Sequence, residues 1–381
     1  MASGTETSAL RRAVALSARA LGTTSPNPPV GAVVLDTAGE LVGEGWTAPP
    51  GGPHAEVVAL QQAGERARGG TVVVTLEPCD HTGRTGPCTT ALLDAGVARV
   101  VVACTDPTEL AGGGAAVLRA AGVDVETGVL ADEVALGPLE AWLTSRRTGR
   151  PFVTWKYAAT LDGRSAAADG TSRWITSEGS RADVHRLRAE ADAVVAGVGT
   201  VLADDPLLDA RPDLDVAVTH QPLRVVVDTH GRTPLTARCL AGASPALVVT
   251  GPLLEDAGYP RTAQVAAGDD GHLDLQALLR LLADEHDVVS VLLEGGPALA
   301  GGFVARGLVD RVVGYVAPAL LGDGTHALGA AGAGTITAAH RLRLDDVTRT
   351  GDDVRLTLRP LTGPLTGPLD GPRDRPDARS A

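Results

Sequence analysis

Lysine and aromatic residues are scarce in this sequence. Lys156 is the only lysine among 381 residues, every other basic residue is an arginine, and aromatic residues make up 2% of the chain. The formal net charge is −13. Nucleic-acid binding needs basic patches and usually aromatic stacking platforms, so nucleic acid is not an expected partner.

The sequence also lacks the features of a secreted or membrane protein. It does not open with a charged and then apolar segment, and it contains no long uncharged apolar run. Neither secretion nor membrane insertion is therefore expected. Four cysteines are too few for a disulfide framework in a chain of this length, and two of them belong to a motif that suits metal binding. This usage predicts a reducing, cytoplasmic location.

The length and the 44% hydrophobic content predict two packed domains. In the first, residues 1–146, apolar strands alternate with helical patterns, which indicates an α/β layer domain. The predicted strands are 30–35, 71–76 and 98–103, and the predicted helices are 8–21, 56–63, 89–95 and 115–121.

The polar, Gly- and Pro-bearing stretch 144–151 is the predicted linker to a second α/β domain, residues 150–360. Its predicted strands are 152–158, 193–196, 223–228, 246–250, 288–294 and 311–317. Residues 361–381 are rich in Gly, Pro and Asp without a periodic apolar face, so a disordered tail is expected there.

A hydrolytic zinc site is predicted from G-P-H-A-E (52–56) and C-D-H-T-G-R-T-G-P-C (79–88). His54, Cys79 and Cys88 would bind zinc and leave its fourth position to water, whose pKa the metal lowers. Glu56 would then carry the protons. The alternatives are unrelated polar residues and cysteines, or a structural zinc site, for which the chain offers no good fourth ligand. Cys104 is expected to be a buried small hydrophobe.

The first domain resembles the deaminase domain of the bifunctional riboflavin-biosynthesis deaminase/reductase. The matching segments are P-N-P-P-V-G-A-V-V (26–34), G-P-H-A-E and L-E-P-C-D-H-T-G-R-T-G-P-C (76–88). The resemblance implies a cytidine-deaminase-like three-layer α/β/α fold in which Asn27, His81 and Arg84 contact the substrate. His81 and Arg84 could instead belong to an exposed polar loop. Thr47 replaces a family histidine, and residues 106–114 match the family only loosely.

Two glycine-rich stretches in the second domain are candidate cofactor-binding motifs. Gly197-Val-Gly199 lacks the third glycine of a Rossmann fingerprint. Residues 288–303 run from an apolar strand through a glycine turn into a helix, which suits phosphate binding.

The second domain resembles the reductase domain of the same family. The matching segments are 153–165, 172–177, 187–211, 228–232 and 292–296, in the same order as in the family. The resemblance implies a dihydrofolate-reductase-like fold and NADPH as the cofactor. The implied cofactor contacts are Ala158, Trp174, Thr200, Asp204, Thr229, Gly296, Pro297, Ala298, Leu299, Ala300, Gly301 and Gly302.

The implied substrate contacts in the second domain are Ser172, Arg188, Leu208, Arg211 and Glu294, of which the two arginines suit the phosphate. Each has a plain structural alternative; Arg188, for example, could be a solvated helix residue. The lone Lys156 is hypothesised to stabilise the opened sugar and to help protonate it, because a compact ammonium approaches a reacting atom differently from a guanidinium. Alternatively, it persists by chance on a solvated strand.

The resemblance implies hydrolytic deamination of 2,5-diamino-6-(ribosylamino)-pyrimidinone 5'-phosphate, followed by NADPH-dependent reduction of its ribosyl chain to ribityl. A homodimer or homotetramer is expected. The alternatives are a specialised paralogue acting on a related pyrimidine or pterin, a nucleoside deaminase with a vestigial reductase domain, and a non-catalytic protein that keeps the fold.

Overall fold

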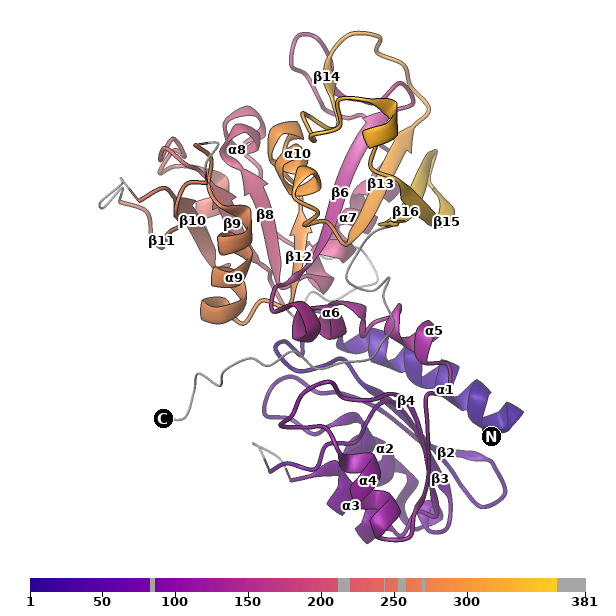
Figure 1. Cartoon of the computed structure of the whole chain (residues 1–381). Helices are drawn as coiled ribbons and strands as arrows, with labels where there is room; N and C mark the ends of the chain where they lie inside the picture. The colour runs from indigo at the N-terminus through magenta and orange to yellow at the C-terminus, as the bar shows by residue number, and fades with distance from the viewer. Residues whose placement is uncertain (83–85, 212–219, 243, 253–257, 269–270, 362–381) are drawn as a thin grey trace. The chain divides into compact units, whose positions relative to one another are not determined.

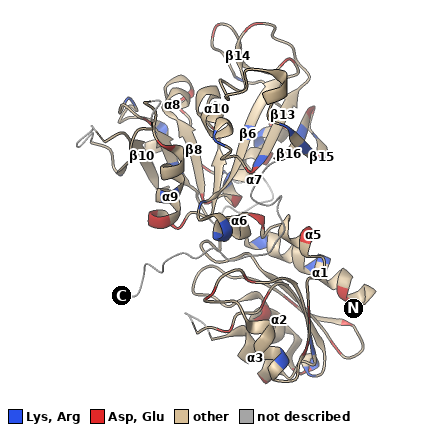
Figure 2. Ribbon diagram, in the orientation of Figure 1, with Lys and Arg blue, Asp and Glu red and all other residues tan. Residues whose placement is uncertain are grey.

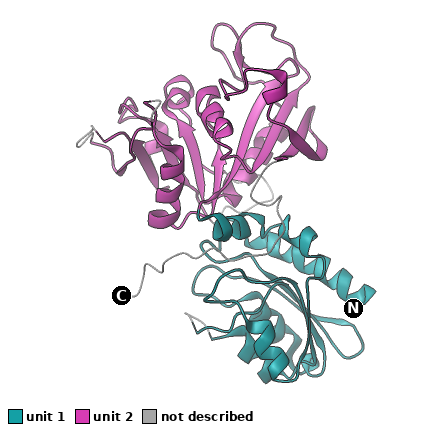
Figure 3. Ribbon diagram, viewed as in Figure 1, with its two compact units in different colours: residues 1–149, 369–381 teal, residues 150–368 magenta. Residues whose placement is uncertain are grey.

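The computed structural model describes residues 1–82, 86–211, 220–242, 244–252, 258–268 and 271–361. The chain divides into two compact units between Gly149 and Arg150 (Figure 3). This boundary falls inside the predicted linker. The predicted tail lies outside the described residues apart from Leu361. Within the described part, every helix is too short or too polar to cross a membrane.

The first unit is built on a five-stranded sheet in the order β2-β1-β3-β4-β5. The strands are β1 (Gly31–Leu35), β2 (Leu41–Trp46), β3 (Thr71–Leu76), β4 (Arg99–Cys104) and β5 (Asp124–Thr127). β1 is antiparallel to both neighbours, whereas β3, β4 and β5 run parallel. β1, β3 and β4 are almost wholly buried, as expected of apolar strands covered on both faces.

Helices form the outer layers of this unit, with α2, α3 and α4 on one face of the sheet and α1, α5 and α6 on the other (Figure 1). Their bounds are α1 (Gly4–Ser17), α2 (Ala55–Ala63), α3 (Cys88–Ala95), α4 (Gly114–Ala120), α5 (Ala131–Ala135) and α6 (Glu140–Thr148). The three-layer α/β/α prediction is thus confirmed.

The predicted linker is helical for most of its length. α6 continues to Thr148, and Gly149 ends it in the left-handed conformation at φ 70°. Trp142, Leu143 and Thr144 are buried. The polar residues that suggested a linker therefore belong to the last turns of an amphipathic helix.

The second unit contains a nine-stranded sheet in the order β11-β10-β9-β8-β12-β6-β13-β16-β15. The strands are β6 (Phe152–Thr160), β8 (Ala193–Gly197), β9 (Leu223–Val227), β10 (Ala246–Thr250), β11 (Thr262–Gln264), β12 (Ser290–Leu293), β13 (Arg311–Ala317), β15 (Leu342–Thr350) and β16 (Asp353–Pro360). All are parallel from β11 to β13, and the β15–β16 hairpin joins β13 antiparallel.

The helices of this unit are α7 (Glu178–Glu190), α8 (Val198–Asp204), α9 (Leu275–His286) and α10 (Pro297–Ala305), and a short ribbon pairs β7 (Arg164–Ala166) with β14 (Thr325–His326). Parallel strands place their carboxyl ends along one edge, where ligands bind in α/β sheets. Figure 2 shows basic and acidic residues interspersed over the helices and strands of each unit.

Candidate active sites

The three predicted zinc ligands lie together in the first unit. His54 is the N-cap residue of α2, Cys79 follows β3, and Cys88 is the first residue of α3. His54 Nδ1 lies 3.2 Å from the sulfur of Cys88 and 3.5 Å from that of Cys79. All three ligand atoms lie within 4.8 Å of one another. Among the described residues, this is the one cluster of His, Cys, Asp or Glu side chains that could hold a metal ion.

One nitrogen and two sulfur donors are a set that zinc prefers, and three protein ligands leave room for water. Hydrogen bonds from Cys88 and from His54 outweigh the effect of burial and together lower the pKa of Cys79 to about 4, while the pKa of Cys88 is raised. One thiolate is thus already favoured before any metal is bound. The residues present fit a catalytic zinc ion.

Glu56 is the second residue of α2, and only 3% of it is exposed. Burial raises the pKa of its carboxyl group, which lies within hydrogen-bonding reach of the Cys88 thiol. A carboxyl group whose proton affinity is raised in this way, beside the ligands, is suited to taking up and releasing protons.

The other predicted residues of this unit lie on loops. Asn27 is half-buried in the loop before β1, and His81 is half-buried with a ring Nδ1 that has no hydrogen-bond partner among the described residues. Arg84 lies outside the described residues. Cys104 is buried, as expected, and burial raises its pKa to about 11.

Thr47 and the 106–114 loop, which depart from the family pattern, are both held by hydrogen bonds. The Thr47 side chain is buried, and its oxygen accepts a hydrogen bond from the Val30 N–H at 3.0 Å. It thus anchors the chain entering β1. The Glu77 carboxylate accepts hydrogen bonds from the N–H groups of Asp106 (3.1 Å) and Ala115 (2.9 Å), which fixes both ends of the 106–114 loop.

Sequence reasoning missed the residues that support Asn27. Trp142 Nε1 and Arg146 Nη2 both donate to the Pro26 carbonyl, at 3.2 and 2.7 Å. These α6 side chains therefore fix the backbone next to Asn27. No local sequence motif predicts this contact, because α6 is more than a hundred residues away in sequence.

The second unit contains a cavity of 1980 Å³ at the carboxyl ends of β6, β8, β9 and β12. This is ample for a dinucleotide and a second small molecule, since a drug-sized ligand occupies about 300–1,000 Å³. All the cofactor and substrate residues predicted in this unit line it, together with Lys156, except Ala300 and Gly301. Ala300 is fully buried, and a Cβ at Gly301 would come within 2.3 Å of the Ala330 carbonyl oxygen, so both residues are packed against the protein.

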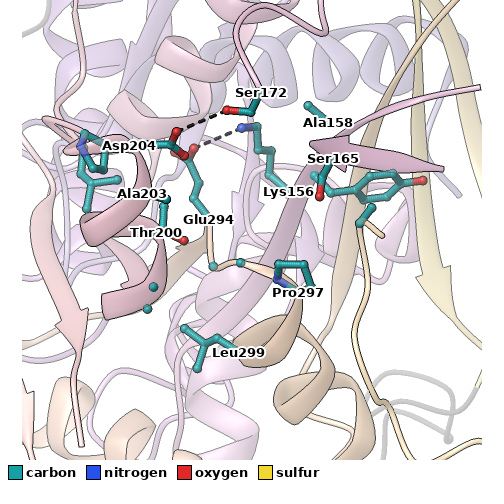
Figure 4. A pocket seen from close by; sticks show the side chains of 18 of the residues that line it. Lys156, Ala158, Ser165, Ser172, Thr200, Ala203, Asp204, Glu294, Pro297 and Leu299 are labelled. Carbon is teal, nitrogen blue, oxygen red and sulfur yellow. Dashed lines mark hydrogen bonds and ion pairs between the residues drawn. The ribbon is translucent and has the colours of Figure 1, made fainter. Parts of the chain in front are cut away.

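Lys156, Arg188 and Glu294 form an ion-pair cluster in the cavity wall. Glu294 Oε2 lies 3.2 Å from Lys156 Nζ (Figure 4). The same oxygen lies 3.0 Å from Arg188 Nη2, and Glu294 Oε1 lies 2.5 Å from Arg188 Nε. Burial alone would raise the pKa of Glu294, but the charges of Arg188 and Lys156 outweigh it and hold this pKa well below its usual range. The carboxylate is therefore ionised.

A second contact joins Ser172 Oγ to Asp204 Oδ1 at 3.3 Å across the cavity (Figure 4). Trp174 lines the cavity with 70% of its surface exposed, and the Arg181 guanidinium lies 4.5 Å from its ring centroid. A flat, exposed indole held by a cation offers a face on which a ring can stack.

Two helices begin side by side at the edge of this cavity. Gly197 and Gly296 are the N-cap residues of α8 and α10, and Pro297 opens α10. A Cβ at Gly296 would lie 3.3 Å from Thr200 Oγ1, and one at Gly295 would lie 3.0 Å from Leu299. The close approach explains the glycines, and the N-terminus of α10 fits a cofactor phosphate.

Fold and sites together define a two-unit enzyme that joins a zinc-type deaminase to a nucleotide-dependent reductase. Residues 4–104 match the cytidine and deoxycytidylate deaminase zinc-binding region, and residues 151–356 match the RibD C-terminal domain. The chain belongs to the RibD family of riboflavin-biosynthesis enzymes, which have both activities. The predicted family, fold class and pair of activities are confirmed.

Relatives that this chain matches over most of their length support the same family assignment. The riboflavin biosynthesis protein RibD of Mycobacterium tuberculosis H37Rv is 50% identical over 88% of this chain and 92% of its own, and that of Escherichia coli K12 is 40% identical over 92% and 98%. An Acinetobacter baumannii RibD structure has a TM-score of 0.85 at 40% identity, covering 93% of this chain and 99% of that one.

A Thermotoga maritima structure has a TM-score of 0.83 at 34% identity, with coverage of 93% and 99%. That protein is described as a diaminohydroxyphosphoribosylaminopyrimidine deaminase/5-amino-6-(5-phosphoribosylamino)uracil reductase.

Proposed function

We propose that the first unit removes ammonia from 2,5-diamino-6-(ribosylamino)-pyrimidinone 5'-phosphate and that the second reduces the ribosyl chain to ribityl with NADPH. The observation that carries this proposal is the pairing of two complete sites on one chain: His54, Cys79, Cys88 and Glu56 in one unit, and the Lys156–Glu294 pair in the other. The description of the Thermotoga maritima relative supports the same substrate class.

In the deaminase unit, His54, Cys79 and Cys88 would hold zinc. A bound zinc ion would supply a water molecule of near-neutral pKa. Glu56 would take one proton from that water and pass it to the ring nitrogen, and would then take the remaining hydroxyl proton and pass it to the amine, which leaves as ammonia. Its burial supports this role, because a carboxyl group of raised pKa both accepts and returns a proton.

Substrate recognition in this unit is assigned to Asn27 for the polar edge of the pyrimidine, and to His81 and Arg84 for the phosphoribosyl group. The unpartnered, buried Nδ1 of His81 supports the assignment, since it has a hydrogen-bonding position to offer. Arg84 rests on the family resemblance alone.

In the reductase unit, a bound nicotinamide would supply the hydride. The α10 N-terminus with Gly296 would hold the cofactor phosphates, and Trp174, Thr200, Asp204 and Thr229 would position its remaining groups. Lys156 donates a proton to the opened sugar as the hydride arrives. The ionised Glu294 holds the ammonium in place.

The two arginines assigned to the substrate phosphate differ in their contacts. Arg188 donates through Nε and Nη2 to Glu294 and through Nη1 to the Asp209 carbonyl at 3.1 Å. Arg211 is more exposed and pairs through Nε with Asp209 at 3.1 Å. Arg211 therefore has more donors to offer, and Arg188 would both orient Glu294 and contribute its charge.

The substrate proposal is tested by assaying ammonia release from four amines: the pathway substrate, its dephosphorylated form, cytidine and adenosine. Ammonia should be released rapidly from the phosphorylated pathway substrate alone. Equal rates with cytidine would overturn the assignment of substrate while leaving the zinc chemistry intact. Assembly into a homodimer or homotetramer stays a prediction, which light scattering of the purified protein measures.

A further inference from the structure

Three loops of the first unit meet at one edge of its sheet. β1 runs antiparallel to β3 with Ala32 opposite Val74, so the residues before β1 lie beside those after β3. β3 and β4 are parallel with Leu76 opposite Cys104, so the residues that follow these two strands also lie together. The loop before β1 and the loop after β4 therefore flank the segment after β3, which carries the predicted zinc ligand Cys79.

The loop before β1 contains Asn27, whose side chain is not held by a contact of its own. Among the described residues, no hydrogen bond engages the Asn27 side-chain amide. The Asn27 N–H donates to the Thr24 carbonyl at 2.8 Å, and Pro26 and Pro28 on either side restrict the backbone. The direction in which the amide points therefore depends on how the backbone of this loop is held.

Two side chains of α6 hold that backbone at the peptide bond leading into Asn27. Arg146 Nη2 and Trp142 Nε1 donate to the Pro26 carbonyl oxygen, at 2.7 and 3.2 Å. Trp142 is 4% exposed, and the Arg146 guanidinium lies 5.5 Å from the centroid of its ring. A carbonyl oxygen has two lone pairs, and both are engaged here, so the plane of this peptide bond is fixed.

Arg146 also acts on the loop after β4. Burial raises the pKa of the Asp106 carboxyl group, and the positive charge of Arg146 opposes that rise. The Asp106 carboxyl group accepts hydrogen bonds from the N–H and the hydroxyl of Thr108, at 2.8 and 2.6 Å. The Asp106 N–H donates to Glu77, two residues before Cys79. One arginine thus serves both of the loops that flank the zinc-ligand segment.

We infer that Arg146 is a positioning residue of the deaminase site, which orients Asn27 through the Pro26 carbonyl and so sets the affinity for the substrate. Trp142 assists through the second hydrogen bond. This inference rests on the proposed role of Asn27 at the polar edge of the pyrimidine and adds the side chains that aim it. Hydrogen bonds to that edge are made in the bound substrate and in the transition state alike, so their loss raises KM and leaves kcat nearly unchanged.

The experiment measures ammonia release by the zinc-loaded, full-length protein over a range of concentrations of the pathway substrate. Arg146→Met keeps the apolar stem and removes the donors, so KM should rise at least about tenfold with kcat within about threefold of the wild type. Trp142→Phe keeps a ring and removes the other donor, and should raise KM by about threefold. Arg11→Met, which removes a surface ion pair with Glu133, is the matched control and should behave as the wild type.

A double-mutant cycle shows whether Arg146 acts through Asn27. Asn27→Ala alone should raise KM at least about tenfold. If the two residues act as one unit, the variant that combines Asn27→Ala with Arg146→Met should be no worse than Asn27→Ala. A merely structural role for Arg146 would instead lower the melting temperature without a selective rise in KM, and its effect would multiply that of Asn27→Ala.

The outcomes separate this inference from the function on which it rests. A wild type that releases no ammonia from the pathway substrate, or an unchanged KM in Asn27→Ala, would overturn the proposed function or the role of Asn27. A raised KM in Asn27→Ala with wild-type kinetics in Arg146→Met would overturn the role of Arg146 alone. Multiplied effects in the double variant, or a fall in kcat at unchanged KM, would also contradict it. Zinc content and reduction of the deaminated intermediate should match the wild type in every variant, which reports that both units are folded.

Discussion

Lys156 Nζ lies 3.2 Å from Glu294 Oε2, although the two residues are 138 positions apart in the chain. The parallel pairing of β12 with β6 places Leu293 opposite Trp155. Glu294, the first residue after β12, therefore lies beside Lys156, which is still within β6. Glu294 is 7% exposed at its side chain and is also bound by Arg188. The lone lysine is thus held by an ionised carboxylate at the cavity wall.

Replacing Lys156 by arginine should impair reduction although the charge is kept. A guanidinium at position 156 would need more room and would compete with Arg188 for the two Glu294 oxygens. We expect NADPH-dependent turnover of the deaminated intermediate to fall at least tenfold, about 1.4 kcal/mol of barrier. Ammonia release from the pathway substrate serves as the internal control and should not change. Reduction at the wild-type rate would show that the chemistry does not require a lysine.

Glu56→Gln should keep zinc and lose deamination. The amide preserves the shape of the buried side chain beside Cys88 but cannot carry a proton, and general acid–base catalysis contributes about 10²–10⁴-fold. Metal analysis should still find one zinc per chain. Glu65→Gln, at a 96% exposed carboxylate just beyond α2, is the matched control. Near-normal ammonia release from Glu56→Gln would contradict the mechanism.

Cleaving the chain between Gly149 and Arg150 should separate the activities. The fragment 1–149 retains the whole of α6, which holds the Pro26 carbonyl, and should release ammonia. The fragment from 150 onward keeps the Arg150–Asp310 ion pair, whose two hydrogen bonds measure 2.7 and 2.8 Å, and should oxidise NADPH when given the deaminated intermediate. Deamination by the second fragment would show that the sites are assigned to the wrong units.

Asp162 should make stability depend on pH in the acid range. Its carboxylate accepts hydrogen bonds from the Thr160 hydroxyl and from the N–H groups of Gly322 and Leu321, which lower its pKa to about 2 from 3.8. Because the folded pKa is the lower one, this stabilisation is present above about pH 4 and is lost as the pH falls towards 2.

Asp162→Asn should therefore lower the melting temperature of the reductase unit at pH 7, and the difference from the wild type should shrink between pH 4 and 2. Asp323→Asn, in the same loop region, is the control and should change little at either pH. A difference that stays constant down to pH 2 would mean that the carboxylate charge contributes nothing.

Much of the fold was predictable because its central strands are runs of buried β-branched residues. The predicted strands 71–76, 246–250 and 311–317 coincide with β3, β10 and β13. β2 was missed because its glycines look like turn residues. A Cβ at Gly43 or Gly45 would come within 2.2 Å or less of a carbonyl oxygen in α2, so these glycines allow helix and strand to approach closely.

The β15–β16 hairpin was missed for another reason. Its strands carry many charged residues, and β15 is exposed along nearly its whole length. They are strands because β13, distant in sequence, pairs with β16. Such non-local pairing leaves little trace in local hydrophobicity.

The zinc site could be predicted because its ligands belong to two short sequence motifs, residues 52–56 and 79–88, with recognisable spacing. The residues of the reductase cavity could not be predicted from their spacing in the sequence, because Lys156 and Glu294 come together only through the register of β6 and β12. They were predicted from the family resemblance instead.

The most direct test of two sequential activities is to incubate the zinc-loaded protein with the phosphorylated diaminopyrimidinone, with and without NADPH, and to follow ammonia and NADPH together. The account predicts that ammonia is released at the same rate in both mixtures, and that one NADPH per ammonia is oxidised after a lag in which the deaminated intermediate accumulates. NADPH oxidation that precedes ammonia release, or continues in Glu56→Gln protein given only the starting substrate, would contradict it.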